Sequence, residues 1–273
     1  SLYYKELEKL YGKANFYSMD PFHEGGNTAG VDLDAAGKAV MKAMKKANPK
    51  AVWVAQAWQA NQRPKMIENL KAGDLLILDL TSECRPQWGD STSEWYRKNG
   101  YGQHDWIYCM LLNYGGNVGL HGKMDNVIDN FYLAKADPHA SATLKGVGMT
   151  PEGIENNPVM YELVMELPWR PDRFTKEEWL KEYVKARYGV DDPVVQAAWT
   201  NLANSIYNSP KNLTQQGIET TIVERMEQVM APLDSDMACS VHAYLREKGV
   251  NLRLGETVAG FTSNEAGLRV RLE

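Results

Sequence analysis

Two glutamates stand where strand-like segments end, and each is followed by glycine. Glu24 closes the aromatic and apolar run that begins at Asn15, and Glu152 lies shortly after the run 144–147. Glycoside hydrolysis uses such a pair, because one carboxyl protonates the leaving oxygen while the other attacks the anomeric carbon or activates water. Glu152 also has a simpler explanation, because it can cap a helix that begins near Ile154. The chemistry therefore depends on a fold that brings the two carboxylates together.

The segments that would position these acids alternate between strand and helix. Strands are expected at residues 15–22, 51–58, 75–80, 106–114 and 144–147, and helices at residues 2–11, 33–47 and 64–72. Such alternation is typical of a parallel β/α sheet. The carboxyl ends of its strands meet at one face, where the βα loops carry chemistry. The pattern therefore predicts that Glu24 and Glu152 share that face.

Two loops in this region invite a functional interpretation. Residues 86–104 are polar and aromatic and are too long for an ordinary connection, which favours a functional loop. The glycines of residues 115–122 fit neither a phosphate-binding loop nor a dinucleotide fingerprint. They either bring the backbone and the Asn113 and Asn117 amides close to a polar ligand, or simply form turns.

Composition excludes several classes of function. The chain has 273 residues, 44% hydrophobic content and a formal charge of −5, which gives no basic footprint for nucleic acid. No apolar run is long enough to span a membrane, and the charged N-terminal segment is unlike a signal peptide. The three cysteines have no metal-ligand spacing and cannot form an even disulfide framework. We expect no metal site.

Beyond Ile154 the pattern becomes helical and then changes again. Helices are expected at residues 157–167, 176–188 and 193–207. Near Gly217 the composition changes. A strand is expected at 218–224, then a helix at 235–248, a strand at 249–254 and a hairpin that ends at 272.

Four motifs in order resemble the α-N-acetylglucosaminidases of glycoside hydrolase family 89. They are Phe22-His23-Glu24, residues 53–58, residues 106–117 and residues 148–154. The resemblance covers roughly residues 1–216. It implies a (β/α)8 catalytic barrel followed by an α-helical domain, no cofactor, and retaining removal of terminal α-linked N-acetylglucosamine from a glycan. Its members are secreted, periplasmic or lysosomal.

Carried onto this chain, the resemblance makes Glu24 the general acid/base and Glu152 the nucleophile. The substrate-binding residues that it implies are His23, Gln56, Trp58, Leu111 and Asn113. His23 departs from the amide that the animal enzymes carry before the acid/base, although a histidine can also donate a hydrogen bond. Trp58 could instead be a barrel-core aromatic, and the Gln56 amide could satisfy a neighbouring loop.

The expected fold class is α/β, with a partial (β/α)8 TIM-type barrel, an α-helical region and a short α/β tail. The expected domains are a barrel at 1–155, a helical domain at 156–216 and a Rossmann-like fragment at 217–273. A full barrel takes ~250 residues, so about five strands make only part of one. Open strand edges favour association, and an oligomer is therefore possible.

The tail, residues 218–273, resembles the NAD-binding region of FAD-dependent pyridine nucleotide-disulfide oxidoreductases. In that family an acid at the position of Glu224 holds the ribose 2′-hydroxyl. The glycine fingerprint that should precede it is absent, so a solvated acid at a strand end is the alternative. Two other functions thus stand beside the glycosidase: a fragment of a nucleotide-binding oxidoreductase, and a carbohydrate-binding remnant without turnover.

Overall fold

The computed structural model describes residues 2–24, 26–112, 120–152, 157–208, 221–229, 234–247, 250–264 and 267–273. These residues belong to two compact units. The first lies within residues 1–116 and 121–216, and the second within residues 117–120 and 217–273. Among the described helices, none is both long and apolar enough to cross a membrane.

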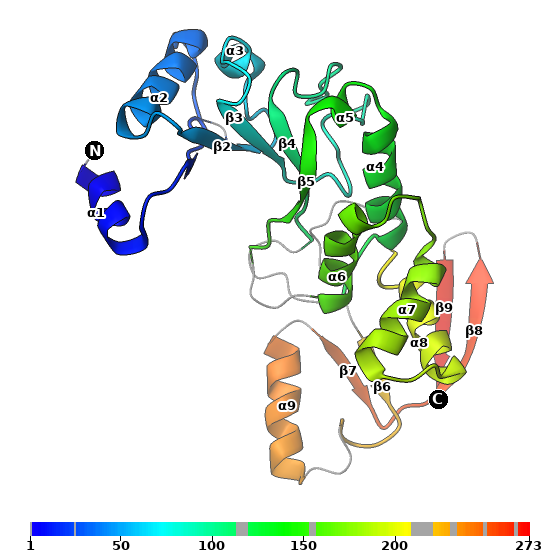
Figure 1. The fold of residues 1–273 in the computed structure, drawn as a ribbon. Helices are drawn as coiled ribbons and strands as arrows, with labels where there is room; N and C mark the ends of the chain where they lie inside the picture. The colour runs from blue at the N-terminus through cyan, green and yellow to red at the C-terminus, as the bar shows by residue number, and fades with distance from the viewer. Residues whose placement is uncertain are drawn as a thin grey trace. The chain divides into compact units, whose positions relative to one another are not determined.

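The first unit is built on a five-stranded parallel sheet whose strands lie side by side in chain order (Figure 1). The strands are β1 (Phe16–Ser18), β2 (Val52–Ala57), β3 (Leu75–Asp79), β4 (Asp105–Met110) and β5 (Leu144–Met149). Helix α1 (Leu2–Tyr11) precedes β1, and the helices between the strands are α2 (Leu33–Ala47), α3 (Pro64–Ile67), α4 (Met124–Ala136) and α5 (Ala140–Thr143). Parallel strands in chain order, joined by helical crossovers except between β3 and β4, form part of a (β/α)8 barrel, as the sequence predicts.

The two faces of this sheet differ in burial. In β2 and β3 every second residue is buried, so Trp53 pairs with Leu75, and Ala57 with Asp79, on the buried face. The helices cover this face, since the Tyr108 hydroxyl donates to Val127 of α4. Gln56 lies on the other, half-buried face. In a closed barrel the face turned away from the helices is the interior.

Helix α2 shows how tightly the helical layer packs. Asp32 caps its first turn by accepting a hydrogen bond from the Ala35 amide at 3.0 Å. Gly37 is buried in the middle of the helix, and a Cβ there would lie 1.9 Å from the Met66 carbonyl oxygen. The glycine is therefore required by close contact with α3 rather than by helix propensity.

Several elements differ from the sequence-based expectations. The expected helix at 64–72 ends at Ile67, because turns follow before Gly73, which has φ +81°. Strand β1 is only three residues long. The expected strand at 106–114 ends at Met110, since the amides of the next two residues donate to Glu83 rather than to a strand. Helix α4 was not predicted.

A helical region completes the first unit. Its elements are α6 (Pro158–Glu166), the 3-10 helix η1 (Leu167–Trp169), α7 (Lys176–Tyr188) and α8 (Pro193–Ala203). Thr175 and Glu178 form a capping box at the start of α7, and Gly189 ends the helix in a left-handed conformation. The expected helix at 176–188 is confirmed, whereas the one at 193–207 ends at Ala203 in turns that return the amide of Tyr207 to Leu202.

The second unit is small. Strands β6 (Thr221–Glu224) and β7 (Asn251–Leu254) pair in parallel and are connected through α9 (Ser235–Glu247), which makes a β-α-β arrangement. Strands β8 (Val258–Asn264) and β9 (Gly267–Leu272) form an antiparallel hairpin. The strand, helix and hairpin expected in the tail are therefore present within its described residues.

Candidate active site

Glu24 lies in a tight loop between β1 and α2. Phe22 has φ +62° and Glu24 φ +45°, a left-handed conformation that is uncommon for residues other than glycine. The indole Nε1 of Trp58 donates a hydrogen bond to Oε1 of Glu24 at 3.2 Å. Trp58 directly follows β2 and is half-buried, while Glu24 is exposed. Two predicted site residues from neighbouring strands are thus in contact.

Asp20 ties the same loop to the end of β2. Its Oδ1 accepts hydrogen bonds from the backbone amide of Gln56 at 2.7 Å and from Nε2 of Gln62 at 3.0 Å. Burial raises the pKa of this carboxyl above its usual value, against the lowering effect of these bonds and of His23. Gln56 is therefore tied to this loop through its backbone amide.

His23 contacts a residue that sequence reasoning missed. Nδ2 of Asn61 lies 3.1 Å from Nδ1 of His23. Asn61 is 3% exposed, whereas His23 is exposed. The loop 20–24 is thus joined to the β2 exit at Gln56, Trp58, Asn61 and Gln62.

Two buried carboxyl groups lie at the end of β3 and just beyond it, and neither was predicted as a site residue. Asp79 is 0% exposed and Glu83 is 1% exposed. Burial raises the pKa of Asp79 to about 7 and that of Glu83 to about 8. Oε1 of Glu83 accepts from the amides of Leu111 at 3.2 Å and Leu112 at 3.4 Å. Glu83 therefore fixes the exit of β4, where Leu112 has φ +58°.

The loop that follows Glu83 links the β3 and β2 exits. The Gln87 amide donates to Oδ2 of Asp79 at 3.2 Å, and its side chain donates to the Gln59 carbonyl at 2.9 Å. Arg97 donates from Nε to Oε1 of Gln87 at 2.8 Å and from Nη2 to the Gln62 carbonyl. The long loop expected to be functional is therefore part of the framework that holds the site.

Two further predicted residues, Leu111 and Glu152, follow β4 and β5. Leu111 is 2% exposed, so its side chain is packed. Asn113 lies outside the described residues, as does Asn117. Glu152 is exposed and follows β5, whose exit is tied to β4 because the Thr150 amide donates to the Met110 carbonyl at 3.0 Å. Glu24 and Glu152 thus follow the two outer strands of the sheet at its carboxyl end.

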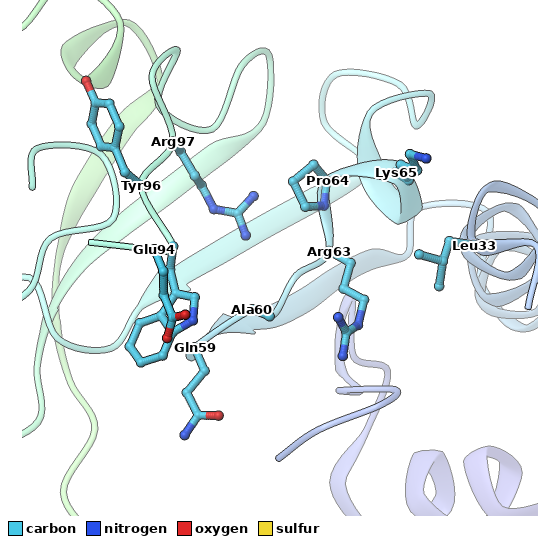
Figure 2. A pocket seen from close by; sticks show the side chains of 10 residues that line it. Leu33, Gln59, Ala60, Arg63, Pro64, Lys65, Glu94, Tyr96 and Arg97 are labelled. Atoms are coloured by element: carbon cyan, nitrogen blue, oxygen red, sulfur yellow. The ribbon is translucent and has the colours of Figure 1, made fainter. Parts of the chain in front are cut away.

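A cavity of about 310 Å³ adjoins the β2 exit. Figure 2 shows it between Leu33 of α2, the segment 59–65 and the segment 94–97. Its charged lining residues are Arg63, Lys65, Glu94 and Arg97. Nη2 of Arg63 also reaches the Gly26 carbonyl, two residues after Glu24, at 3.4 Å. The cavity therefore borders the loop that carries Glu24.

The described residues contain no group of three or more His, Cys, Asp or Glu side chains placed to hold a metal ion. None of the three cysteines is in a disulfide: Cys84 is half-buried, Cys109 buried and Cys239 exposed. Burial raises the pKa of the Cys109 thiol, so this residue is an unreactive part of the packing.

A parallel β/α sheet with acids, an indole and an imidazole gathered at the carboxyl ends of its strands is the site architecture of barrel glycosidases. Residues 1–171 match the family model "Alpha-N-acetylglucosaminidase (NAGLU) tim-barrel domain", and residues 179–237 match "Alpha-N-acetylglucosaminidase (NAGLU) C-terminal domain". The chain belongs to the α-N-acetylglucosaminidase family, glycoside hydrolase family 89.

Among its relatives is human alpha-N-acetylglucosaminidase, which is 34% identical over 220 residues, 76% of this chain and 28% of that protein. Among solved structures, a family 89 glycoside hydrolase from Clostridium perfringens in complex with PUGNAc is 30% identical. It has a TM-score of 0.68 and covers 80% of this chain and 24% of that one. A second structure from this organism holds 2-acetamido-1,2-dideoxynojirimycin, at 28% identity and a TM-score of 0.67 over 84% of this chain and 25% of that one.

A third clostridial structure, with two glutamates changed to glutamine, is in complex with its substrate GlcNAc-α-1,4-galactose. It is 29% identical, with a TM-score of 0.64 over 84% of this chain and 25% of that chain. The chain thus spans about a quarter of the length of these relatives.

Residues 211–273 also match a different family model, "Pyridine nucleotide-disulphide oxidoreductase". This match overlaps the C-terminal glycosidase model, which extends to residue 237. Within the second unit, Oε1 of Glu224 accepts from the Met226 amide at 2.9 Å. The acid that would hold a ribose therefore closes a local turn.

Proposed function

We propose that this chain carries the catalytic pair of a retaining exo-glycosidase that removes terminal α-linked N-acetylglucosamine. Glu24 serves as acid/base and Glu152 as nucleophile. The observation that carries the proposal is the position of these acids at the carboxyl ends of β1 and β5, with Glu24 held by Trp58. Strands four places apart in an eight-stranded barrel face each other across its axis, which supports a pair that meets over the mouth.

The reaction has two steps, in which Glu152 is the nucleophile of the first and Glu24 acts first as acid and then as base. Glu152 attacks the anomeric carbon while Glu24 protonates the departing oxygen; Glu24 then removes a proton from the water that releases the sugar. This requires the two carboxyl groups to lie ~5 Å apart. The Trp58 N–H orients Glu24 for both transfers, so we assign Trp58 a positioning role beside its stacking role. His23, Gln56, Leu111 and Asn113 would line the sugar site.

The remainder of the glycan should lie on the Glu24 side, because the acid protonates the oxygen of the leaving group. The cavity beside Gln59 adjoins this side and has room for a further sugar. A relative in complex with GlcNAc-α-1,4-galactose supports a substrate of this class.

The test is release of chromophore from an aryl α-N-acetylglucosaminide by the purified chain. Glu24→Gln and Glu152→Ala should each abolish turnover while circular dichroism remains unchanged, and Glu8→Gln, on an exposed face of α1, serves as the control. Azide should restore turnover to Glu152→Ala by replacing the nucleophile, and the anomer released first by the native chain should be α. An unchanged rate in Glu152→Ala would rule out the proposal.

A carbohydrate-binding function without turnover is the second candidate, because the chain spans only about a quarter of the relatives it matches. Measurable affinity for 2-acetamido-1,2-dideoxynojirimycin without hydrolysis would favour it.

The match of residues 211–273 supports nucleotide binding as a third candidate. Because Oε1 of Glu224 already accepts a hydrogen bond from the Met226 amide, we expect no thermal shift with NADH. A clear shift would support nucleotide binding.

A further inference from the structure

The contact between Asn61 and His23 bears on which imidazole nitrogen carries a proton. In this structure the amide nitrogen Nδ2 of Asn61 faces Nδ1 of His23 at 3.1 Å, and because an amide nitrogen can only donate, Nδ1 accepts in this arrangement. A neutral imidazole has one donor and one acceptor nitrogen. The proton of the neutral ring is therefore on Nε2.

The Asn61 amide is held on a rigid support. Asn61 is 3% exposed, and its backbone amide donates to the Trp58 carbonyl at 2.9 Å. The next residue, Gln62, is 1% exposed and donates a hydrogen bond to Asp20. His23 is exposed, and within the described part of the chain its Nε2 makes no hydrogen bond. The ring is thus anchored through one nitrogen and open through the other.

We infer that Asn61 is a positioning residue that fixes His23 in the Nε2–H tautomer, so that His23 presents a hydrogen-bond donor beside Glu24. The use of this donor rests on the proposed function. Its partner is a hydroxyl or acetamido oxygen of the terminal sugar. An acetamido carbonyl can only accept, so the opposite tautomer, with a lone pair on Nε2, would not bond to it.

The tautomer is measured by two-bond 1H–15N correlation on chain labelled with 15N-histidine, at an alkaline pH where imidazoles are neutral. His23→Asn removes one set of signals and thereby assigns His23. The native chain should show Nε2–H. Asn61→Asp, whose carboxylate only accepts, should move the proton to Nδ1. Nδ1–H in the native chain would overturn the inference, as would an unchanged tautomer in Asn61→Asp.

The use of the donor is measured by calorimetry with 2-acetamido-1,2-dideoxynojirimycin. Asn61→Asp should weaken affinity about tenfold, the loss of one hydrogen bond of about 1.4 kcal/mol. In the His23→Asn background the same change should have little further effect, because an amide donates without a tautomer. An equal loss in both backgrounds would show that Asn61 acts by some other route.

Failure of the native chain to bind the inhibitor would count against the proposed function and against the use of the donor. The tautomer would still be decided by the NMR measurement. A reversed tautomer in Asn61→Asp with unchanged affinity would overturn only the assignment of the donor to the sugar.

Discussion

Trp58, which is proposed to contact the sugar, also donates a hydrogen bond to Glu24, the proposed acid/base. Replacing it with phenylalanine keeps an aromatic ring but removes the N–H that reaches Glu24. Because a hydrogen bond typically contributes about 1 kcal/mol, we expect kcat/KM for the aryl glycoside to fall about fivefold. Trp169→Phe, at a side chain that is 84% exposed, is the control and should leave kcat/KM unchanged. Equal effects of the two changes would remove the positioning role.

Glu83 makes stability depend on pH. Its pKa is raised from 4.5 to about 8 by burial, so the folded state retains a proton that the unfolded chain releases. The free energy of unfolding therefore falls as pH rises from about 4.5 to about 8, at about 1.4 kcal/mol per pKa unit at most, and then levels off. Glu83→Gln removes this contribution.

Urea unfolding over a pH series checks this expectation. Glu83→Gln should gain stability relative to the native chain as pH rises toward 8 and should match it near pH 4, where the native carboxyl is protonated in both states. Glu94→Gln, at an exposed acid, should show no such trend. A constant difference across the series would mean that Glu83 is ionised in the folded protein.

Among the elements, α2 depends on a glycine for its packing. Gly37→Ala would gain about 1 kcal/mol from helix propensity alone. Instead we expect a net loss of stability, because a Cβ would lie 1.9 Å from the Met66 carbonyl oxygen and α2 would have to move away from α3. Ala39→Gly, on the exposed face of the same helix, is the control and should cost about 1 kcal/mol. A stabilised Gly37→Ala in thermal unfolding would contradict the packing argument.

The elements with a clear apolar or helical pattern in the sequence were predicted, and those without one were missed. The strands β2 and β3 have mainly apolar runs, β5 is a short run followed by glycine and proline, and α2 and α7 have clear helical spacing with caps, so these were predicted within about two residues. Helix α4 was missed because its apolar residues lie among asparagines and aspartates between two glycine-containing segments. The end of β4 was misplaced because it is set by a carboxylate 28 residues earlier in the chain.

The candidate site, like the elements, was predictable where the signal is local in the sequence and was missed where it depends on distant residues. Residues directly after strands were found from their positions in the pattern. Asn61 was missed because its role depends on a side chain 38 positions earlier. Glu83 was missed because an acid in a polar segment is normally solvated and nothing local indicates its burial. Its position just after a strand, like that of Glu24, is the signal that could have identified it.

For the whole molecule, the outer edge of β1 bears on association. Strand β1 pairs only with β2 among the described strands, and Phe16 on it is 61% exposed. Since an open edge with an exposed aromatic residue favours pairing between chains, Phe16→Lys should shift the chain toward monomer. Sedimentation velocity over a concentration series measures this. Leu133→Lys, at a 58% exposed position on α4, is the matched control, and an equal shift in both would exclude the edge as the contact.

The chain-order sheet has a mechanical consequence. Tension applied between the two ends of the first unit reaches the sheet at opposite edges, because β1 and β5 are its outermost strands. Strand β1 is held by three residue pairs, whereas β5 is held by five. In an optical trap the first unit should therefore lengthen first by the release of β1.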